Sequence, residues 1–202
     1  MDPVFAIALW ALLFLGSHLV ISSRAVRPRL IAVVGERAYP GIYSLVAFAT
    51  FVPLVLVFAH HKHSGVMLWN PRDVPAVRFL VWLLMLFAFI IFIASFIAFS
   101  TFGIAHILMN GFVGDVIFFG TFPALSIIGG MHQDARKEAQ LGAPYKSLVD
   151  STSFFPGLAL IQGRQHWTAA DTPWIAIVIG ILMTVAIVWL HPTIFGGNPL
   201  GM

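Results

Sequence analysis

The stretch VRFLVWLLMLFAFIIFIASFIAF, residues 77–99, decides the fold class of this chain. It consists mainly of Leu, Phe and Ile, and Arg78 is its only charged residue. A helix needs about 20 consecutive apolar residues to cross the hydrocarbon core of a bilayer. The stretch is long enough for that, so it predicts a transmembrane helix.

The composition of the whole chain supports a membrane protein. Of its 202 residues, 59% are hydrophobic and 9% are charged, whereas about a quarter of an ordinary soluble domain is charged. The net charge of +3 reflects scarce carboxylates, which excludes a nucleic-acid binder. The chain has no Cys, which excludes disulfide scaffolds, thiolate catalysis and iron–sulfur clusters. We therefore expect an all-α, polytopic bundle of transmembrane helices that forms one domain over residues 1–202.

Further apolar segments set the number of spans. Three are long enough to cross a bilayer: Val4–Ile21, Gly41–Ala59 and Trp174–Leu190. Two shorter segments, Thr101–Met109 and Val116–Met131, are separated by Asn110-Gly111 and Gly114-Asp115. If they form a transmembrane hairpin, the chain has about six spans. If residues 101–115 are re-entrant, it has five.

Basic loops favour six spans. One basic loop, residues 22–38, follows the first span, and the other lies within the polar segment 132–173. Six spans put both loops on one side, which the positive-inside bias assigns to the cytoplasm. We expect residues 132–173 to form a cytoplasmic loop with an interfacial helix. Because Asp2 precedes the first span and no basic residue does, we interpret that span as retained.

Two of the eight histidines, His18 and His106, lie inside apolar segments. A polar ring in hydrocarbon costs free energy unless it is hydrogen-bonded or ligated, so such residues are functional candidates. Two neutral imidazoles from different helices in a shell rich in Phe and Met meet the requirements of bis-histidine haem. A hydrogen bond from each ring to a neighbouring helix satisfies the same polar atoms, and the residues alone leave both interpretations open.

Other polar residues have simpler expected roles. The tract His60-His61-Lys62-His63 looks like a metal site. The nearest acid is Asp73, so carboxylate ligands are scarce, and we favour an interfacial loop. Asp115 is expected to cap the helix that follows it. Arg164 could hold an anionic group such as a haem propionate, or contact solvent or lipid phosphate.

A series of short motifs runs along the whole chain. The motifs are GSHL (16–19), GERAY (35–39), LWNP (68–71), AHILMNG (105–111), FFG (118–120), TSFFP (152–156), GR (163–164) and LHP (190–192). In this order they resemble the NnrU family of bacterial membrane proteins, which is related to 15-cis-zeta-carotene isomerase. Each motif is short, and together they make the resemblance fairly specific.

The resemblance implies a multi-pass protein of the bacterial inner (cytoplasmic) membrane that is linked to denitrification and nitric-oxide metabolism. In the related isomerase, two histidines bind haem b, and a carotenoid double bond is isomerised from cis to trans. Carried over by motif, the cofactor ligands are His18 and His106, and the propionate role considered above would make Arg164 a further cofactor contact. The expected substrate is a hydrophobic polyene, and no catalytic residue is assigned. The alternative is a non-catalytic accessory subunit of a respiratory complex.

The sequence departs from the family pattern at two places. The isomerase has a Cys ligand three residues before its second histidine, where this chain has Gly103. The family's Arg-His-Pro motif is missing, and residues 93–96 stand at its offset, so we expect a truncated fourth span. His18 lies about 9 Å from the basic side, whereas His106 is only four residues from Asn110. The two histidines are therefore expected at different depths, unless the hairpin tip is sunk in the bilayer or the spans are tilted.

Overall fold

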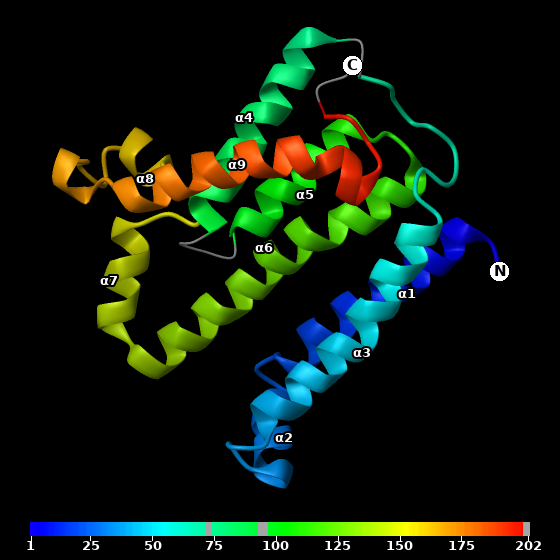
Figure 1. Cartoon of the computed structure of the whole chain (residues 1–202). Coiled ribbons are helices and arrows are strands. Elements are labelled where there is room, and N and C mark those ends of the chain that lie inside the picture. The colour runs from blue at the N-terminus through cyan, green and yellow to red at the C-terminus, as the bar shows by residue number, and fades with distance from the viewer. Residues whose placement is uncertain (72–73, 93–96, 200–202) are drawn as a thin grey trace.

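The computed structural model describes residues 1–71, 74–92 and 97–199, and the described residues are mostly helical (Figure 1). The helices are α1 (Pro3–Ile21), α2 (Arg27–Val34), α3 (Tyr39–His60), α4 (Pro75–Phe92), α5 (Ile97–Met109), α6 (Val113–Leu141), α7 (Ala143–Ser151), α8 (Leu158–Ile161), η1 (Ala169–Asp171) and α9 (Trp174–Phe195). Within this part of the chain there is no strand, only one isolated antiparallel bridge between Met67 and Phe112. The predicted all-α bundle is confirmed.

Four helices, α1, α3, α6 and α9, are long and apolar enough to cross a membrane. The pair α4 and α5 is shorter, and α5 has 13 residues, about 20 Å of helix against a hydrocarbon core of about 30 Å. The truncated fourth span stays a prediction, because α4 and α5 adjoin residues 93–96, which lie outside the described residues. The departure from the family pattern falls on these residues, and Arg72 and Asp73 likewise lie outside the described part of the chain.

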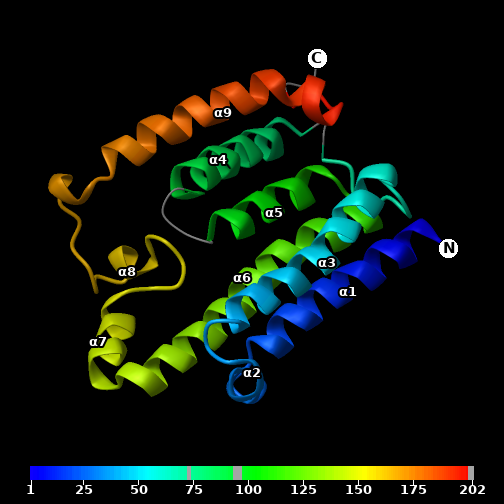
Figure 2. The same ribbon diagram turned by 60° about the horizontal axis from the view of Figure 1, so that its bottom comes forward.

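The helices form a series of packed neighbours. The pair α1 and α3 packs against α6, α5 packs between α6 and α4, and α9 lies across α4 (Figures 1 and 2). The buried core lies among α1, α3 and α6, and its buried members are Ile7, Ala11, Phe14, Leu54, Phe58, Phe118 and Phe119. Large apolar side chains elsewhere face outward, such as Trp189 with 79% exposure. An apolar exterior of this kind suits a lipid environment.

Small residues allow the shorter helices to pack closely. A Cβ atom on Gly103 of α5 would lie 2.6 Å from the backbone oxygen of Phe119 in α6. A Cβ atom on Gly180 of α9 would lie 2.6 Å from Cα of Ile90 in α4. Glycine lets two helix backbones approach one another in this way in membrane bundles.

Two sets of contacts define the ends of the bundle. At one end, Nη1 of Arg136 in α6 donates to the Ser22 carbonyl at the end of α1, 3.1 Å away. We call this the basic end, because Ser22 and Arg136 belong to the two basic segments, residues 22–38 and 132–173. At the opposite end, Lys62 Nζ donates to the Phe195 carbonyl at the end of α9, 3.1 Å away.

Some helix boundaries differ from the sequence expectation. Helix α6 continues ten residues beyond Met131 to Leu141, because residues such as Arg136 and Glu138 leave the apolar pattern while still favouring helix. It ends at Gly142, which has a φ of +64°. Helix α9 passes through Pro192 to Phe195, five residues beyond the end of the predicted span at Leu190. The interfacial position of a helix within residues 132–173, where α7 lies, stays a prediction.

Candidate functional site

His106 is held in a fixed orientation on α5. Its Nδ1 lies 2.9 Å from the Phe102 carbonyl one turn earlier, and since a carbonyl only accepts, Nδ1 is the protonated nitrogen. The ring centroid lies 4.0 Å from that of Phe102 and 4.5 Å from that of Phe119, with the Phe119 ring 27° from parallel. This tautomer leaves Nε2 with its lone pair in an aromatic shell, which suits a metal ligand.

His18 repeats this arrangement on α1. Its Nδ1 lies 2.9 Å from the Phe14 carbonyl, again one turn earlier. Its ring centroid is 4.4 Å from that of Phe14 and 5.2 Å from that of Tyr43 in α3. In both histidines the hydrogen bond stays within the residue's own helix. It is therefore not a bond to a neighbouring helix, which the sequence left open as the alternative to haem ligation.

The two histidines lie at different depths, as expected from the sequence. Ile7 of α1 packs beside Gly114 at the start of α6, where an added Cβ would lie 3.1 Å from its Cδ1. His18 follows Ile7 by eleven residues, about 16 Å along the helix, whereas Phe119, which stacks on His106, lies only about 8 Å beyond Gly114. The depths of the two imidazoles therefore differ by roughly 9 Å.

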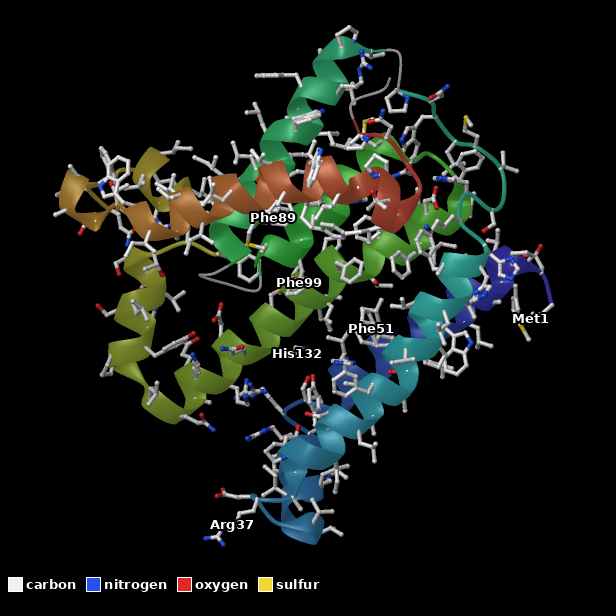
Figure 3. All side chains as sticks on the ribbon, viewed as in Figure 1. Met1, Arg37, Phe51, Phe89, Phe99 and His132 are labelled. Carbon is white, nitrogen blue, oxygen red and sulfur yellow. The ribbon has the colours of Figure 1, made fainter. Side chains whose placement is uncertain are left out.

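Aromatic rings fill the space between the two histidines. The Phe14 ring beside His18 is 5.0 Å from the ring of Phe51 in α3, and Phe51, which Figure 3 labels, is 6.4 Å from Phe122 of α6. Phe122 is 6.1 Å from Phe102, which lies beside His106. A bond from a metal ion to imidazole nitrogen is about 2 Å long. As a pair on one metal ion, His18 and His106 therefore do not fit this arrangement, whereas each ring on its own would hold such an ion through Nε2.

The histidine tract after α3 pairs with an acid far away in the sequence. Asp115 is fully buried and accepts hydrogen bonds from the His63 backbone N–H (3.1 Å) and from His63 Nδ1 (2.7 Å). The expected capping role of Asp115 is therefore wrong, because its carboxylate bonds the loop rather than the first N–H groups of α6, whose N-cap is Phe112. No group of three or more His, Asp or Glu side chains that could hold a metal occurs in the part of the chain described.

Arg164 connects parts of the long polar loop. Its guanidinium donates to the Asp150 carbonyl at 2.6 Å, to the Thr152 carbonyl and to Oε1 of Gln162. These acceptors all belong to residues 150–162, next to α7 and α8. In Figures 1 and 2 this loop lies apart from α1. The role of Arg164 as a cofactor contact stays a prediction.

Comparison with known proteins agrees with the residue pattern. The family model described as NnrU protein matches residues 6–104 and 96–199. The two matches overlap at residues 96–104, beside the place where the family motif is missing. No solved structure matches significantly.

Two curated plant proteins also match. Over 202 residues the chain is 24% identical to 15-cis-zeta-carotene isomerase, chloroplastic, of Zea mays, with 79% of the chain and 53% of the relative covered. Over 244 residues it is 23% identical to the protein of the same name from Arabidopsis thaliana, with 98% of the chain and 62% of the relative covered. The chain thus spans less than two thirds of the length of these relatives.

Proposed function

Because the chain belongs to the NnrU protein family, we propose that it is a haem b protein of the membrane that isomerises a double bond of a carotenoid-like polyene from cis to trans. Its helices place it in a lipid environment, where such a substrate dissolves. The names of the two plant relatives support the reaction class. The link to denitrification and nitric-oxide metabolism stays a prediction of the resemblance.

The observation that carries the proposal is the fixed ring of His106. A metal-bound histidine commonly donates its second ring N–H to a carbonyl, which sets its tautomer and orientation. His106 does this through Phe102, and the Phe119 ring supports one face. A ligand whose rotamer is locked by packing is the kind that a functional site requires.

The remaining roles follow from the placement of the chain's own side chains. His106 would hold the haem through Nε2, and the rings of Phe102 and Phe119 pack against its imidazole. On the same helix, Phe99 lies two turns before His106 and is 41% exposed, so this face of α5 presents an apolar side chain to the surroundings. When bound, haem would supply a Lewis-acidic iron.

We propose that the protein lies in the bacterial cytoplasmic membrane, with its basic end toward the cytoplasm. The support is the bond from Arg136 to Ser22, which joins the two basic segments at one end, together with the positive-inside rule. The two plant relatives are chloroplastic, so the location is tested directly below.

The test is an optical spectrum of the protein purified in detergent from haem-replete cells. We expect a Soret band and a haem content that His106→Ala abolishes. His60→Ala is the matched control, because Nδ1 of His60 makes the same bond to the carbonyl one turn earlier, at Leu56, but on an exposed ring. Colourless wild-type protein, or equal haem content in the wild type and His106→Ala, contradicts haem binding through His106.

The isomerase activity needs its own assay. Haem-loaded protein in lipid vesicles is incubated with 15-cis-zeta-carotene, and the geometric isomers are separated by chromatography. We expect conversion that follows haem content across the wild type, His60→Ala and His106→Ala. Haem-loaded protein that leaves the isomer ratio unchanged contradicts the proposed reaction.

A further inference from the structure

A polar pocket lies at the basic end, where α1, α2, α3 and α6 meet. Its volume is about 190 Å³. The residues that line it are Ser22, Arg27, Tyr39, Tyr43 and Arg136. Neither Arg27 nor Arg136 takes part in the proposed haem site.

The walls of the pocket are tied together by contacts among these residues. The Arg27 guanidinium lies 5.2 Å from the ring centroid of Tyr39, whose hydroxyl donates to the Ile21 carbonyl at 3.1 Å. Arg136 reaches across from α6 and donates to the Ser22 carbonyl at 3.1 Å. The pocket is therefore formed in advance of any ligand, which reduces the entropic cost of binding.

The charge in the pocket is not neutralised within the described residues. The described residues form the ion pairs His63–Asp115 and Lys146–Asp150. Neither pair involves Arg27 or Arg136. Each guanidinium has five N–H donors, and Arg136 uses one in its bond to Ser22. Two arginines with spare donors, beside Ser and Tyr hydroxyls, match the several oxygens of a phosphate group.

The depth of the pocket indicates where such a phosphate comes from. The apolar span α1 ends at Ile21, and the apolar span α3 begins at Tyr39, so the pocket lies where hydrocarbon gives way to headgroups. Basic residues at this level attract anionic lipids. We propose that the pocket binds the phosphate of an anionic lipid headgroup and thereby links α2, α3 and α6 at the basic end.

The test measures how lipids stabilise the full chain purified in detergent. Thermal unfolding is followed while phosphatidylglycerol, phosphatidylcholine or inorganic phosphate is added. We expect phosphatidylglycerol to raise the unfolding temperature well above the effect of phosphatidylcholine. For Arg27→Gln, we expect the half-saturating amount of phosphatidylglycerol to rise about tenfold, as for the loss of one charge-assisted contact.

Arg37→Gln is the control, since Arg37 belongs to the same basic loop but points away from the bundle (Figure 3). Arg37→Gln should respond like the wild type. If Arg27→Gln does not fold, Arg27→Lys replaces it, because it keeps the charge but loses the planar fork, and it should also weaken the response. A wild-type response in the Arg27 variant, or no preference for phosphatidylglycerol, overturns the proposal.

Inorganic phosphate distinguishes a free anion from a lipid. If it stabilises the wild type as strongly as phosphatidylglycerol at equal concentration, the lipid assignment is overturned. His106→Ala separates this proposal from the haem proposal, since we expect that variant to lose its haem and keep the wild-type lipid response.

Discussion

Nδ1 of His63 lies 2.7 Å from Oδ2 of Asp115, and this contact joins the loop after α3 to the first turn of α6. The Asp115 side chain is fully buried, whereas that of His63 is 45% exposed. The carboxylate also accepts the His63 backbone N–H. Two donors from one residue therefore satisfy a buried acid at the end of the bundle opposite the basic end.

Removing this acid should destabilise the protein. For Asp115→Ala, we expect the free energy of unfolding to fall by about 3 kcal/mol or more, because two hydrogen bonds to a buried carboxylate are lost. Asp150→Ala is the control, since its pair with Lys146 is exposed and should contribute far less. Denaturant unfolding in detergent measures both variants. An equal loss of unfolding free energy in the two variants would show that the burial of Asp115 contributes nothing to stability.

Gly103 should not tolerate a side chain. For Gly103→Ala, the new Cβ would lie 2.6 Å from the Phe119 carbonyl oxygen, so α5 must move away from α6. We expect a loss of about 1–3 kcal/mol from overpacking. Gly120→Ala is the control, because nothing lies within 4 Å of a Cβ there. Matching thermal stability in the two variants would contradict the close packing of α5 on α6.

The close packing of Gly103 on α6 also determines whether a side chain at this position could ligate haem. A Cys at position 103 would meet the backbone of α6. We expect Gly103→Cys to lower stability as Gly103→Ala does and to leave the haem spectrum without a thiolate form. A thiolate-type spectrum in Gly103→Cys would show that α5 and α6 separate more easily than this packing implies.

The orientation in the membrane can be read by labelling, because the chain has no Cys. Single variants Arg29→Cys and Ala139→Cys place a thiol at the basic end, and His61→Cys places one at the opposite end. In intact bacterial cells, an impermeable maleimide should label His61→Cys alone, and all three after lysis. Labelling of Arg29→Cys in intact cells would reverse the proposed orientation.

Tyr145, in the segment after α6, should make the stability of the protein depend on pH in the alkaline range. Its hydroxyl donates to Oδ1 of Asp134 at 2.7 Å, and this hydrogen bond raises the pKa of Tyr145 above its ordinary value. The folded state therefore keeps the phenol proton longer than the unfolded state. The resulting small stabilisation is present below about pH 10 and is lost as the pH rises through the raised pKa.

The prediction for Tyr145 is checked by titrating tyrosinate absorbance. Asp134→Asn should move one phenol of the folded protein to a lower pKa, because the acceptor loses its charge. Identical titration curves for Asp134→Asn and the wild type would mean that the hydrogen bond does not persist in solution.

Sequence reasoning found the spans because hydropathy is a local property. Residues 4–21 and 41–59 were predicted close to the observed α1 and α3. The end of α6 was missed, since polarity after Met131 marks the exit from hydrocarbon and says nothing about where helical hydrogen bonding stops. Gly142 provides that stop.

The polar sites were predicted less well, because they depend on tertiary contacts. Asp115 and His63 are 52 residues apart, and no local pattern pairs them. The pocket between Arg27 and Arg136 likewise needs α1 and α6 to run side by side. By contrast, the different depths of His18 and His106 followed from counting residues to the nearest loop, and the packing of α1 on α6 agrees.

Electron paramagnetic resonance of the ferric protein tests the central claim most directly. If His106 is the protein's single axial ligand, the wild type and His18→Ala should give the same high-spin signal, and His106→Ala should give none. A low-spin bis-imidazole signal that disappears in His18→Ala would contradict this account, because it would place His18 and His106 on one iron.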